Sequence, residues 1–208
     1  MSLETELAQG LDAMGLALDE AARRRLVAHV ELVARWNRVH NLTAVRDPSQ
    51  MIVLHVLDSL SLLPHLAHAR RILDVGTGGG FPGVPIAIAR PELEVTLLDS
   101  SHKKCSFLEQ ARTELALTNV GVTCERVEAC RSGQSFDAIV SRAFAELADF
   151  VSQAQHLAAP GARFLAMKGV HPFEEIARVP ATHRVAEVIE LRVPGLDAKR
   201  HLVVMQAA

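Results

Sequence analysis

A glycine-rich segment carries most of the residues that could do chemistry. Between Ile72 and Gly83 the sequence reads Ile-Leu-Asp-Val-Gly-Thr-Gly-Gly-Gly-Phe-Pro-Gly. Glycine permits a positive φ and lets a ligand approach the backbone, and a helix that follows presents free N–H groups at its first turn. An apolar run, a turn with this many glycines and a helix start therefore predict a site for a nucleotide-type cofactor.

Two cofactors are compatible with this turn. The spacing Gly-x-Gly-x-x-Gly from Gly78 to Gly83 satisfies the dinucleotide fingerprint, with Asp99 about 20 residues on, where a ribose-binding acid is expected. However, Asp74 precedes Gly76 by two residues, and a carboxylate there would repel a pyrophosphate but suit the ammonium and sulfonium of S-adenosylmethionine. The chain also has no Tyr, which a short-chain dehydrogenase needs. We therefore expect S-adenosylmethionine rather than NAD, with Asp99 bonding both ribose hydroxyls.

Two later segments extend this prediction. Val127 and Glu128 follow the third candidate strand, where a backbone N–H and a nearby side chain can bind an adenine. Ser141 and Arg142 leave the fourth candidate strand, and they should face the transferring methyl because ligands bind beyond the carboxyl ends of parallel strands. The alternative for Arg142 is an ordinary surface ion pair.

The elements that must position these residues alternate between strand and helix patterns from Arg71 onward. Strands are expected at 72–75, 95–98, 120–124, 138–140 and 164–167, with helices near 84–89, 102–117 and 145–157. This alternation predicts a parallel sheet covered on both faces. Residues 185–193 and 201–205, joined through Pro194-Gly195, predict an antiparallel hairpin that closes the sheet.

The first third of the chain has a helical pattern instead. Leu3, Leu7, Leu11 and Met14 form one apolar stripe, which Gly15 ends. Asp19 can cap a second helix, and Asp47-Pro48 can start a third that runs from Met51 to Leu63, where Pro64 stops it. We expect a helical cap over residues 1–67 and an α/β body over residues 68–208.

Composition limits the classes of partner and compartment. Lys and Arg number 22 against 24 Asp and Glu, so a nucleic acid would have to meet a local patch rather than a polycationic chain. The odd set of Cys105, Cys124 and Cys130 lacks a CxxC spacing, which indicates free thiols and no metal site. The acidic N-terminus and the absence of a long apolar run favour a cytoplasmic protein without a membrane segment. No obligate protein partner is evident.

These motifs resemble those of the RsmG (GidB) family of bacterial 16S ribosomal RNA guanine-N7 methyltransferases. The resemblance implies the class I (Rossmann-like) methyltransferase fold and transfer of a methyl group from S-adenosylmethionine to N7 of a guanine in the 530 loop. Carried over by residue, it places cofactor contacts on Gly76, Phe81, Val127, Glu128 and Arg142. The segments that carry it are Trp36–Thr43, His55–Ser59, Leu73–Gly83, Leu98–Ser100, Ser141–Phe144, Lys168–Gly169 and Arg200–Leu202.

Methylation at N7 requires that the guanine be positioned but needs no general base, because N7 carries a free lone pair. The guanine must be recognised, and Arg142, Arg200 and Lys168 are candidates for its O6 and for phosphates, the two arginines acting as catalytic residues. Arg38 and His40 on the cap could hold the RNA backbone, or they could be an ordinary solvated helix face.

The sequence leaves open the role of one polar pair and the class of substrate. His55 and Asp58 lie three residues apart on one helix, and a structural tie between cap and body is favoured over a catalytic pair. The same fold could serve a small-molecule or protein methyltransferase, and a nucleotide-binding module would be a non-enzymatic function. The substrate could be naked 16S rRNA or a 30S particle.

Overall fold

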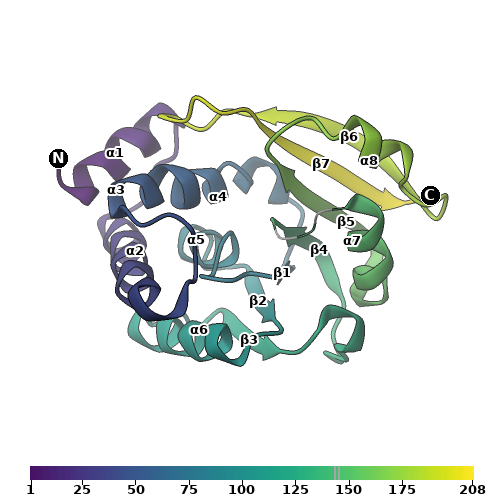
Figure 1. Ribbon diagram of the computed structural model, residues 1–208, viewed down its shortest axis with the longest axis horizontal. Helices are drawn as coiled ribbons and strands as arrows, with labels where there is room; N and C mark the ends of the chain where they lie inside the picture. Colours follow the sequence, from purple (N-terminus) through teal and green to yellow (C-terminus); the bar gives the residue numbers. More distant parts are fainter. Residues whose placement is uncertain (143, 145) are drawn as a thin grey trace.

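A seven-stranded sheet forms the centre of the molecule. The structure is a computed structural model that describes residues 1–142, 144 and 146–208, and within these residues the strand order is β3-β2-β1-β4-β5-β7-β6 (Figure 1). The strands are β1 Arg71–Val75, β2 Glu94–Asp99, β3 Val120–Cys124, β4 Phe136–Ser141, β5 Ala158–Lys168, β6 His183–Leu191 and β7 Arg200–Ala207.

The first five strands pair in parallel, and the last two are antiparallel. β7 pairs with both β5 and β6, so the final strand of the chain lies inside the sheet and β6 lies at its edge. The sequence accounts for this order, since β7 contains a continuous apolar run, Leu202–Met205, that is buried on both faces, whereas β6 alternates with exposed residues. The expected mostly parallel sheet with a C-terminal antiparallel hairpin is confirmed.

Neighbouring residues of β1 pack into two separate hydrophobic layers on opposite faces of the sheet. Ile72 of β1 belongs to the layer under the N-terminal helices, together with α5 (Gly83–Ala89) and α6 (His102–Glu114). Leu73 belongs to the opposite layer with α7 (Leu147–Ala154). This period of two is the one that a sheet covered on both faces requires. Residue 145, the expected start of the 145–157 helix, lies outside the described residues.

The N-terminal region contains the expected caps at Asp19 and Asp47, and a further one at Ser2 that was not predicted. In α1 (Leu3–Ala13) Ser2 accepts from the Thr5 N–H, and in α2 (Glu20–His40) Asp19 accepts from the Ala22 N–H at 2.7 Å. Asp47 accepts from the Ser49 N–H at the start of α3 (Pro48–Met51). Each side chain satisfies an N–H that the first helical turn leaves without a partner.

The prediction of one continuous helix from Met51 to Leu63 is wrong, because this segment changes its helical type. A π-helical segment, η1 (Ile52–Leu57), follows α3 and passes into a short α4 (Asp58–Leu60). Pro64 does not end the helix but lies in the first turn of a separate 3-10 helix, η2 (Leu63–Leu66), where its missing N–H costs nothing. The Ser59 and Ser61 hydroxyls donate to the backbone carbonyls of His55 and Asp58, which accompanies this change of helical type.

The apolar stripe of the predicted cap is buried in the same cluster as residues of the predicted body. Leu7, Leu11 and Leu26 share that cluster with Ile72 and Val84. α1 approaches η1 closely, because a Cβ at Gly10 would come within 2.3 Å of Leu57 Cδ1. The division at residues 67 and 68 stays a prediction.

One buried histidine joins α2 to the glycine-rich turn and makes folding sensitive to pH. His29 is completely buried, and its Nε2 lies 2.9 Å from the Gly79 carbonyl oxygen, so the neutral ring donates there. Nδ1 has no partner among the described residues. Burial lowers the pKa of His29 from 6.5 to about 4. The folded protein therefore binds this proton more weakly than the unfolded chain, and stability is lost as the pH falls below 6.5.

We predict that His29→Gln reduces this loss of stability. Between about pH 7.5 and about pH 5.5, His29 should lower the free energy of unfolding by about 1 kcal/mol, and the variant should lack that contribution. Urea unfolding of both proteins at the two pH values measures the difference, in which the other titrating groups cancel. Equal pH dependence in the two proteins would contradict the assignment to His29.

Candidate functional site

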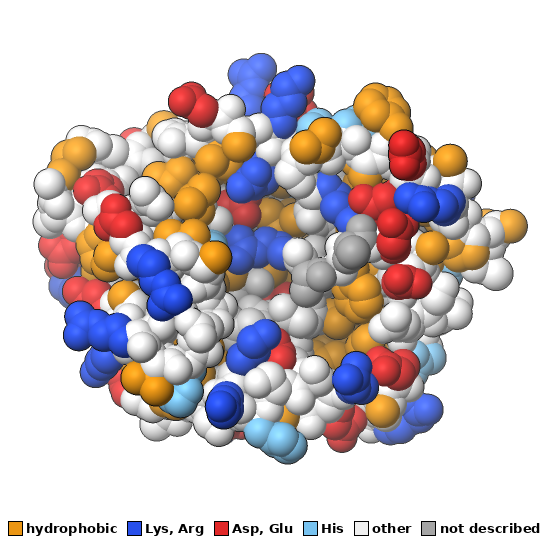
Figure 2. Space-filling model, viewed as in Figure 1, with side chains coloured by type: hydrophobic (Ala, Val, Ile, Leu, Met, Phe, Trp, Pro, Cys, Tyr) orange, Lys and Arg blue, Asp and Glu red, His pale blue; other side chains and the backbone are white. Residues whose placement is uncertain are grey.

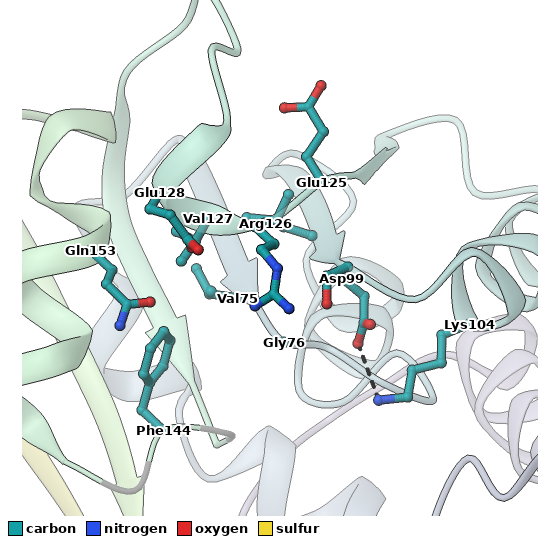
Figure 3. A pocket seen from close by; sticks show the side chains of 12 residues that line it. Val75, Gly76, Asp99, Lys104, Glu125, Arg126, Val127, Glu128, Phe144 and Gln153 are labelled. Atoms are coloured by element: carbon teal, nitrogen blue, oxygen red, sulfur yellow. Dashed lines mark ion pairs between the residues drawn. The ribbon is translucent and has the colours of Figure 1, made fainter.

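The carboxyl ends of β1, β2 and β3 surround a cavity of about 270 Å³, which we call the first pocket (Figure 3). Four residues expected to bind the cofactor, Gly76, Asp99, Val127 and Glu128, line it. They come from the carboxyl ends of β1 and β2 and from the segment after β3, which a parallel sheet brings to one edge. The structure therefore brings four of the predicted residues together at one pocket, and their contact with the cofactor stays a prediction.

The Asp99 carboxylate is held at the edge of the first pocket. Its Oδ2 accepts from the Gly78 N–H at 3.0 Å, and its Oδ1 accepts from the Ser101 N–H at 2.9 Å. Lys104 Nζ forms an ion pair with Oδ2 at 3.5 Å. A carboxylate oxygen can accept more than one hydrogen bond, so both oxygens retain capacity for the hydroxyls of a bound ribose.

Eight further residues line the first pocket, among them four for which the sequence predicted no cofactor contact: Lys104, Arg126, Phe144 and Gln153. Figure 3 shows the Arg126 side chain reaching into the pocket between Asp99 and Glu128, with Phe144 and Gln153 on the opposite wall. Lys104 lies in the first turn of α6, shortly after Asp99, so its position could have been inferred. Phe144 and Gln153 reach the pocket only through the tertiary fold.

Asp74, expected to contact the cofactor cation, does not line the first pocket, and that contact stays a prediction. The Asp74 side chain is completely buried beneath the glycine-rich turn, and its Oδ2 accepts from Thr77 Oγ1 at 2.6 Å and from the Gly83 N–H at 2.7 Å. A Cβ at Gly83 would lie 2.8 Å from this oxygen and 2.3 Å from Leu97 Cδ2. Burial raises the pKa of Asp74 to about 6. Asp74 therefore fastens the turn to the start of α5.

Phe81 and Gly78 also support the site rather than line the first pocket. The Phe81 ring is buried between the imidazole rings of His29 and His55, each at 4.7 Å between centroids. The guanidinium of Arg142 lies 5.6 Å from the centroid of the same ring. The Gly78 N–H is directed to Asp99. These contacts join the turn to the N-terminal helices and orient the acid that faces the pocket.

A second pocket of about 430 Å³ lies where the N-terminal helices meet the ends of β4, β5 and β7. It brings together Arg142, Lys168 and Arg200, the three residues expected to recognise the guanine. Figure 2 shows Lys and Arg side chains gathered around a hollow on this face of the molecule. Residues from three distant parts of the chain thus form one cationic pocket.

Asp58 is the acid at the centre of the second pocket. It is 2% exposed, its Oδ2 accepts from Arg142 Nη1 at 2.9 Å, and its Oδ1 forms an ion pair with Arg200 Nε at 3.2 Å. Arg142 Nη1 also donates to the Leu54 carbonyl oxygen at 3.3 Å. Asp58 therefore ties the predicted cap to the body, as favoured from the sequence.

His55 does not pair with Asp58. Its Nε2 lies 2.7 Å from Thr43 Oγ1, and its Nδ1 lies 2.9 Å from the Leu54 carbonyl oxygen. Burial, together with the nearby Arg142 charge, lowers the pKa of His55 to about 4. The neutral ring donates through Nδ1 and accepts the Thr43 hydroxyl through Nε2, which is a structural arrangement.

Lys168 is held by two acceptors in addition to lining the second pocket. Its Nζ donates to the Phe144 carbonyl oxygen at 3.0 Å and to Glu175 Oε2 at 2.6 Å. Arg38 is exposed, and His40 packs on the Trp36 ring at 4.9 Å, so the structure places both on the last turns of α2. Neither lines the two pockets described here. Their assignment to RNA stays a prediction, and Ala143 of the Ser141–Phe144 motif lies outside the described residues.

The described residues contain neither a metal-ligating cluster nor a membrane-spanning helix. No group of three or more His, Cys, Asp or Glu side chains among them could hold a metal ion. No helix in the same part of the chain has the length and apolarity needed to cross a membrane.

We predict that the Asp58 ion pairs stabilise the protein cooperatively. Asp58→Ala should lower the free energy of unfolding by roughly 2 kcal/mol, because it leaves two partly buried guanidinium groups without their acid. Adding Arg142→Ala should cost less than the sum of the single changes, by about 1 kcal/mol. Urea unfolding of the four proteins measures this coupling. Glu20→Ala, which breaks an exposed pair with Arg24, is the control and should change stability by under about 0.5 kcal/mol. Additive costs for Asp58 and Arg142 would show that the pair contributes nothing.

Solved structures similar to this chain are methyltransferases. The O-methyltransferase TomG from Streptomyces achromogenes, in complex with SAM, is 18% identical, with a TM-score of 0.62, and the match covers 100% of this chain and 99% of that one. An O-methyltransferase from Bacillus cereus, in complex with SAH, is 19% identical, with a TM-score of 0.59 and coverage of 99% and 100%. At these identities the similarity shows the fold, and it confirms the class I α/β architecture.

Similarity in sequence identifies the family. The GidB family model, described as rRNA small subunit methyltransferase G, matches residues 22–203. A protein named ribosomal RNA small subunit methyltransferase G from Nitrosospira multiformis is 52% identical over 215 residues, covering 100% of this chain and 99% of its own. The protein of the same name from Laribacter hongkongensis is 56% identical over 203 residues, with 98% of both chains covered. The chain therefore belongs to the GidB family of methyltransferases, as its motifs indicated.

Proposed function

We propose that this protein transfers a methyl group from S-adenosylmethionine to N7 of a guanine in the 530 loop of 16S ribosomal RNA. The observation that carries the proposal is the connection between the two pockets. Ser141 Oγ donates to the Val75 carbonyl oxygen at 2.8 Å, and Val75 lines the first pocket. The next residue, Arg142, lines the second pocket. The end of β4 thus connects the first pocket, which contains Asp99 and Glu128, to the second pocket, which contains Arg142 and Arg200, and this supports methyl transfer from a cofactor in one to an RNA base in the other.

The first pocket suits the adenosine part of the cofactor. Asp99 has lone pairs on both oxygens for the ribose hydroxyls, and we assign the adenine to the Val127 backbone and Glu128, which line the same pocket. Gly76, with a φ of 69°, brings the backbone close to the pocket without a Cβ. Asp74 and Gly78 contribute through the turn and through Asp99. The cofactor, when bound, supplies a methyl group activated by the positive charge of its sulfonium.

The second pocket suits a guanine and its phosphates. Guanidinium groups bind guanine O6 and phosphate oxygens through their fork of N–H donors, so we assign these contacts to Arg142 and Arg200. Lys168 adds positive charge at the same wall. N7 keeps its lone pair at neutral pH, so these residues need to orient the base and exclude water rather than remove a proton. Rate enhancement then comes from positioning at the junction of the two pockets.

The partner that this proposal requires is 16S rRNA, free or within the 30S particle, in the bacterial cytoplasm. Arg38 and His40 on the last turns of α2 are assigned to the RNA backbone. The test of the function is incubation of purified protein, cofactor and 16S rRNA, followed by mass spectrometry of the RNA fragments. Methylation outside the 530 loop, or of small molecules only, would contradict it.

We predict that Asp99→Ala weakens binding of S-adenosylmethionine by roughly 1.5–3 kcal/mol, because charge-assisted hydrogen bonds to the ribose are lost. Titration calorimetry measures the affinity, with Asp12→Ala, an exposed acid on α1, as a control that should match the wild type. NAD should bind to neither protein at comparable concentrations. Tighter binding of NAD than of S-adenosylmethionine would overturn the cofactor assignment.

The two arginines of the second pocket should differ in their effect on the cofactor. Arg142 lines the second pocket and directly follows Ser141, whose hydroxyl is hydrogen-bonded to Val75 of the first pocket, so we expect Arg142→Ala to lower cofactor affinity and methyl transfer together. Arg200 begins β7 and lines only the second of them, so Arg200→Ala should leave cofactor affinity within about 0.5 kcal/mol while transfer to rRNA falls at least about tenfold. Cofactor titration and single-turnover methylation decide this. Normal methylation by Arg200→Ala, or loss of cofactor binding equal to that of Arg142→Ala, would refute the role of Arg200.

A further inference from the structure

One phenylalanine differs from the rest in its exposure. The chain has seven Phe, of which six are buried or half-buried, whereas Phe173 is 73% exposed. It begins α8 (Phe173–Ala177), after a loop in which Val170 is 81% exposed. A single exposed apolar side chain is common on a protein surface, so the exposure of Phe173 gains meaning only from the residues around it.

The Phe173 ring is held in place by stacked side chains. Its centroid lies 3.8 Å from that of the His171 ring, with the two planes at 28°. His171 in turn meets the edge of His201 at 5.4 Å, and His201 Nδ1 lies 3.1 Å from the Gly169 carbonyl oxygen. The two histidines, His171 and His201 of β7, therefore form a support for the Phe173 ring, and most of that ring remains in water.

This support adjoins the second pocket at Gly169 and at Arg200. Gly169, which His201 contacts, lines that pocket, and His171 follows it by two residues. Arg200, the residue before His201, lines the pocket as well. Glu175 fixes α8 to the same wall through Lys168 Nζ at 2.6 Å and the Leu147 N–H at 3.1 Å. The flat apolar face of the Phe173 ring thus lies near the second pocket, which contains the guanidinium groups of Arg142 and Arg200.

We propose that Phe173, backed by His171, is a stacking site for an unpaired base of the substrate RNA next to the methylated guanine. This inference rests on the function proposed above. Every base has a π-face that stacks on an aromatic ring regardless of sequence, while the adjoining cations bind the phosphates on either side. A protein partner is less well matched, because two exposed apolar side chains beside a charged pocket make too small a patch for a stable interface.

The test compares three variants at Phe173. Phe173→Ala and Phe173→Leu remove the aromatic face, and Leu retains apolar bulk. Both should raise the KM for RNA about tenfold in methylation assays. They should leave kcat within about twofold and the affinity for S-adenosylmethionine unchanged, because the ring lies outside the first pocket. Phe173→Trp should restore the wild-type KM. Thermal unfolding of each variant confirms that the fold is retained.

A direct measurement follows from the single native Trp of the chain. The Phe173→Trp protein should show fluorescence quenching by a single-stranded oligonucleotide of the 530-loop sequence, beyond the response of the wild type, which reports Trp36 alone. Wild-type KM in Phe173→Ala would overturn the stacking site and leave the proposed function intact. Normal KM in Phe173→Leu alone would show an apolar contact without stacking, which also overturns it. Failure of the wild type to methylate 16S rRNA would instead refute the proposed function.

Discussion

The arrangement of the second pocket depends on one buried carboxylate shared by two arginines. Asp58 comes from the helices of the N-terminal third, whereas Arg142 and Arg200 come from the ends of β4 and β7. Removing an acid from water is costly, and the cost is offset only while both guanidinium groups remain beside it. The N-terminal helices therefore cannot separate from the sheet without leaving charges uncompensated. The same ion pairs that hold the two parts together fix the guanidinium groups that face the pocket.

Asp74 within β1 and Asp99 at the end of β2 have the same side chain, but their environments give them different roles. Asp74 is beneath the turn, where burial raises its pKa to about 6 and internal donors take up its Oδ2. Asp99 ends the neighbouring strand at the rim of the first pocket, with one backbone N–H on each oxygen and Lys104 nearby. One acid shapes the turn, and the other is presented to a ligand. The turn itself forms part of this link, because the Gly78 N–H orients Asp99.

The sequence predicted what local pattern determines and missed what depends on tertiary contacts. β1, β2 and β3 agree within one residue of the expected ranges, since short β-branched runs between turn residues define such strands. The π-helical form of η1 and the role of Pro64 were missed, because hydrophobic spacing does not distinguish one helical hydrogen-bond pattern from another. The direction of the Asp74 side chain depends on the space left by Gly83, and the position of Phe81 depends on two histidines from the N-terminal helices. None of these contacts is visible in the spacing of the motif.

Charge at the second pocket limits how an RNA could be recognised there. Arg142 and Arg200 share Asp58, and Lys168 is paired with Glu175, so the local excess of positive charge is small, in keeping with the net charge of −2. A guanidinium has five N–H donors, so an arginine that gives one or two to Asp58 still has donors for a base or a phosphate. Attraction by charge alone therefore contributes little, and recognition has to come from hydrogen-bond direction, shape and stacking within a fixed pocket. Such a pocket is selective for a base that the RNA presents unpaired.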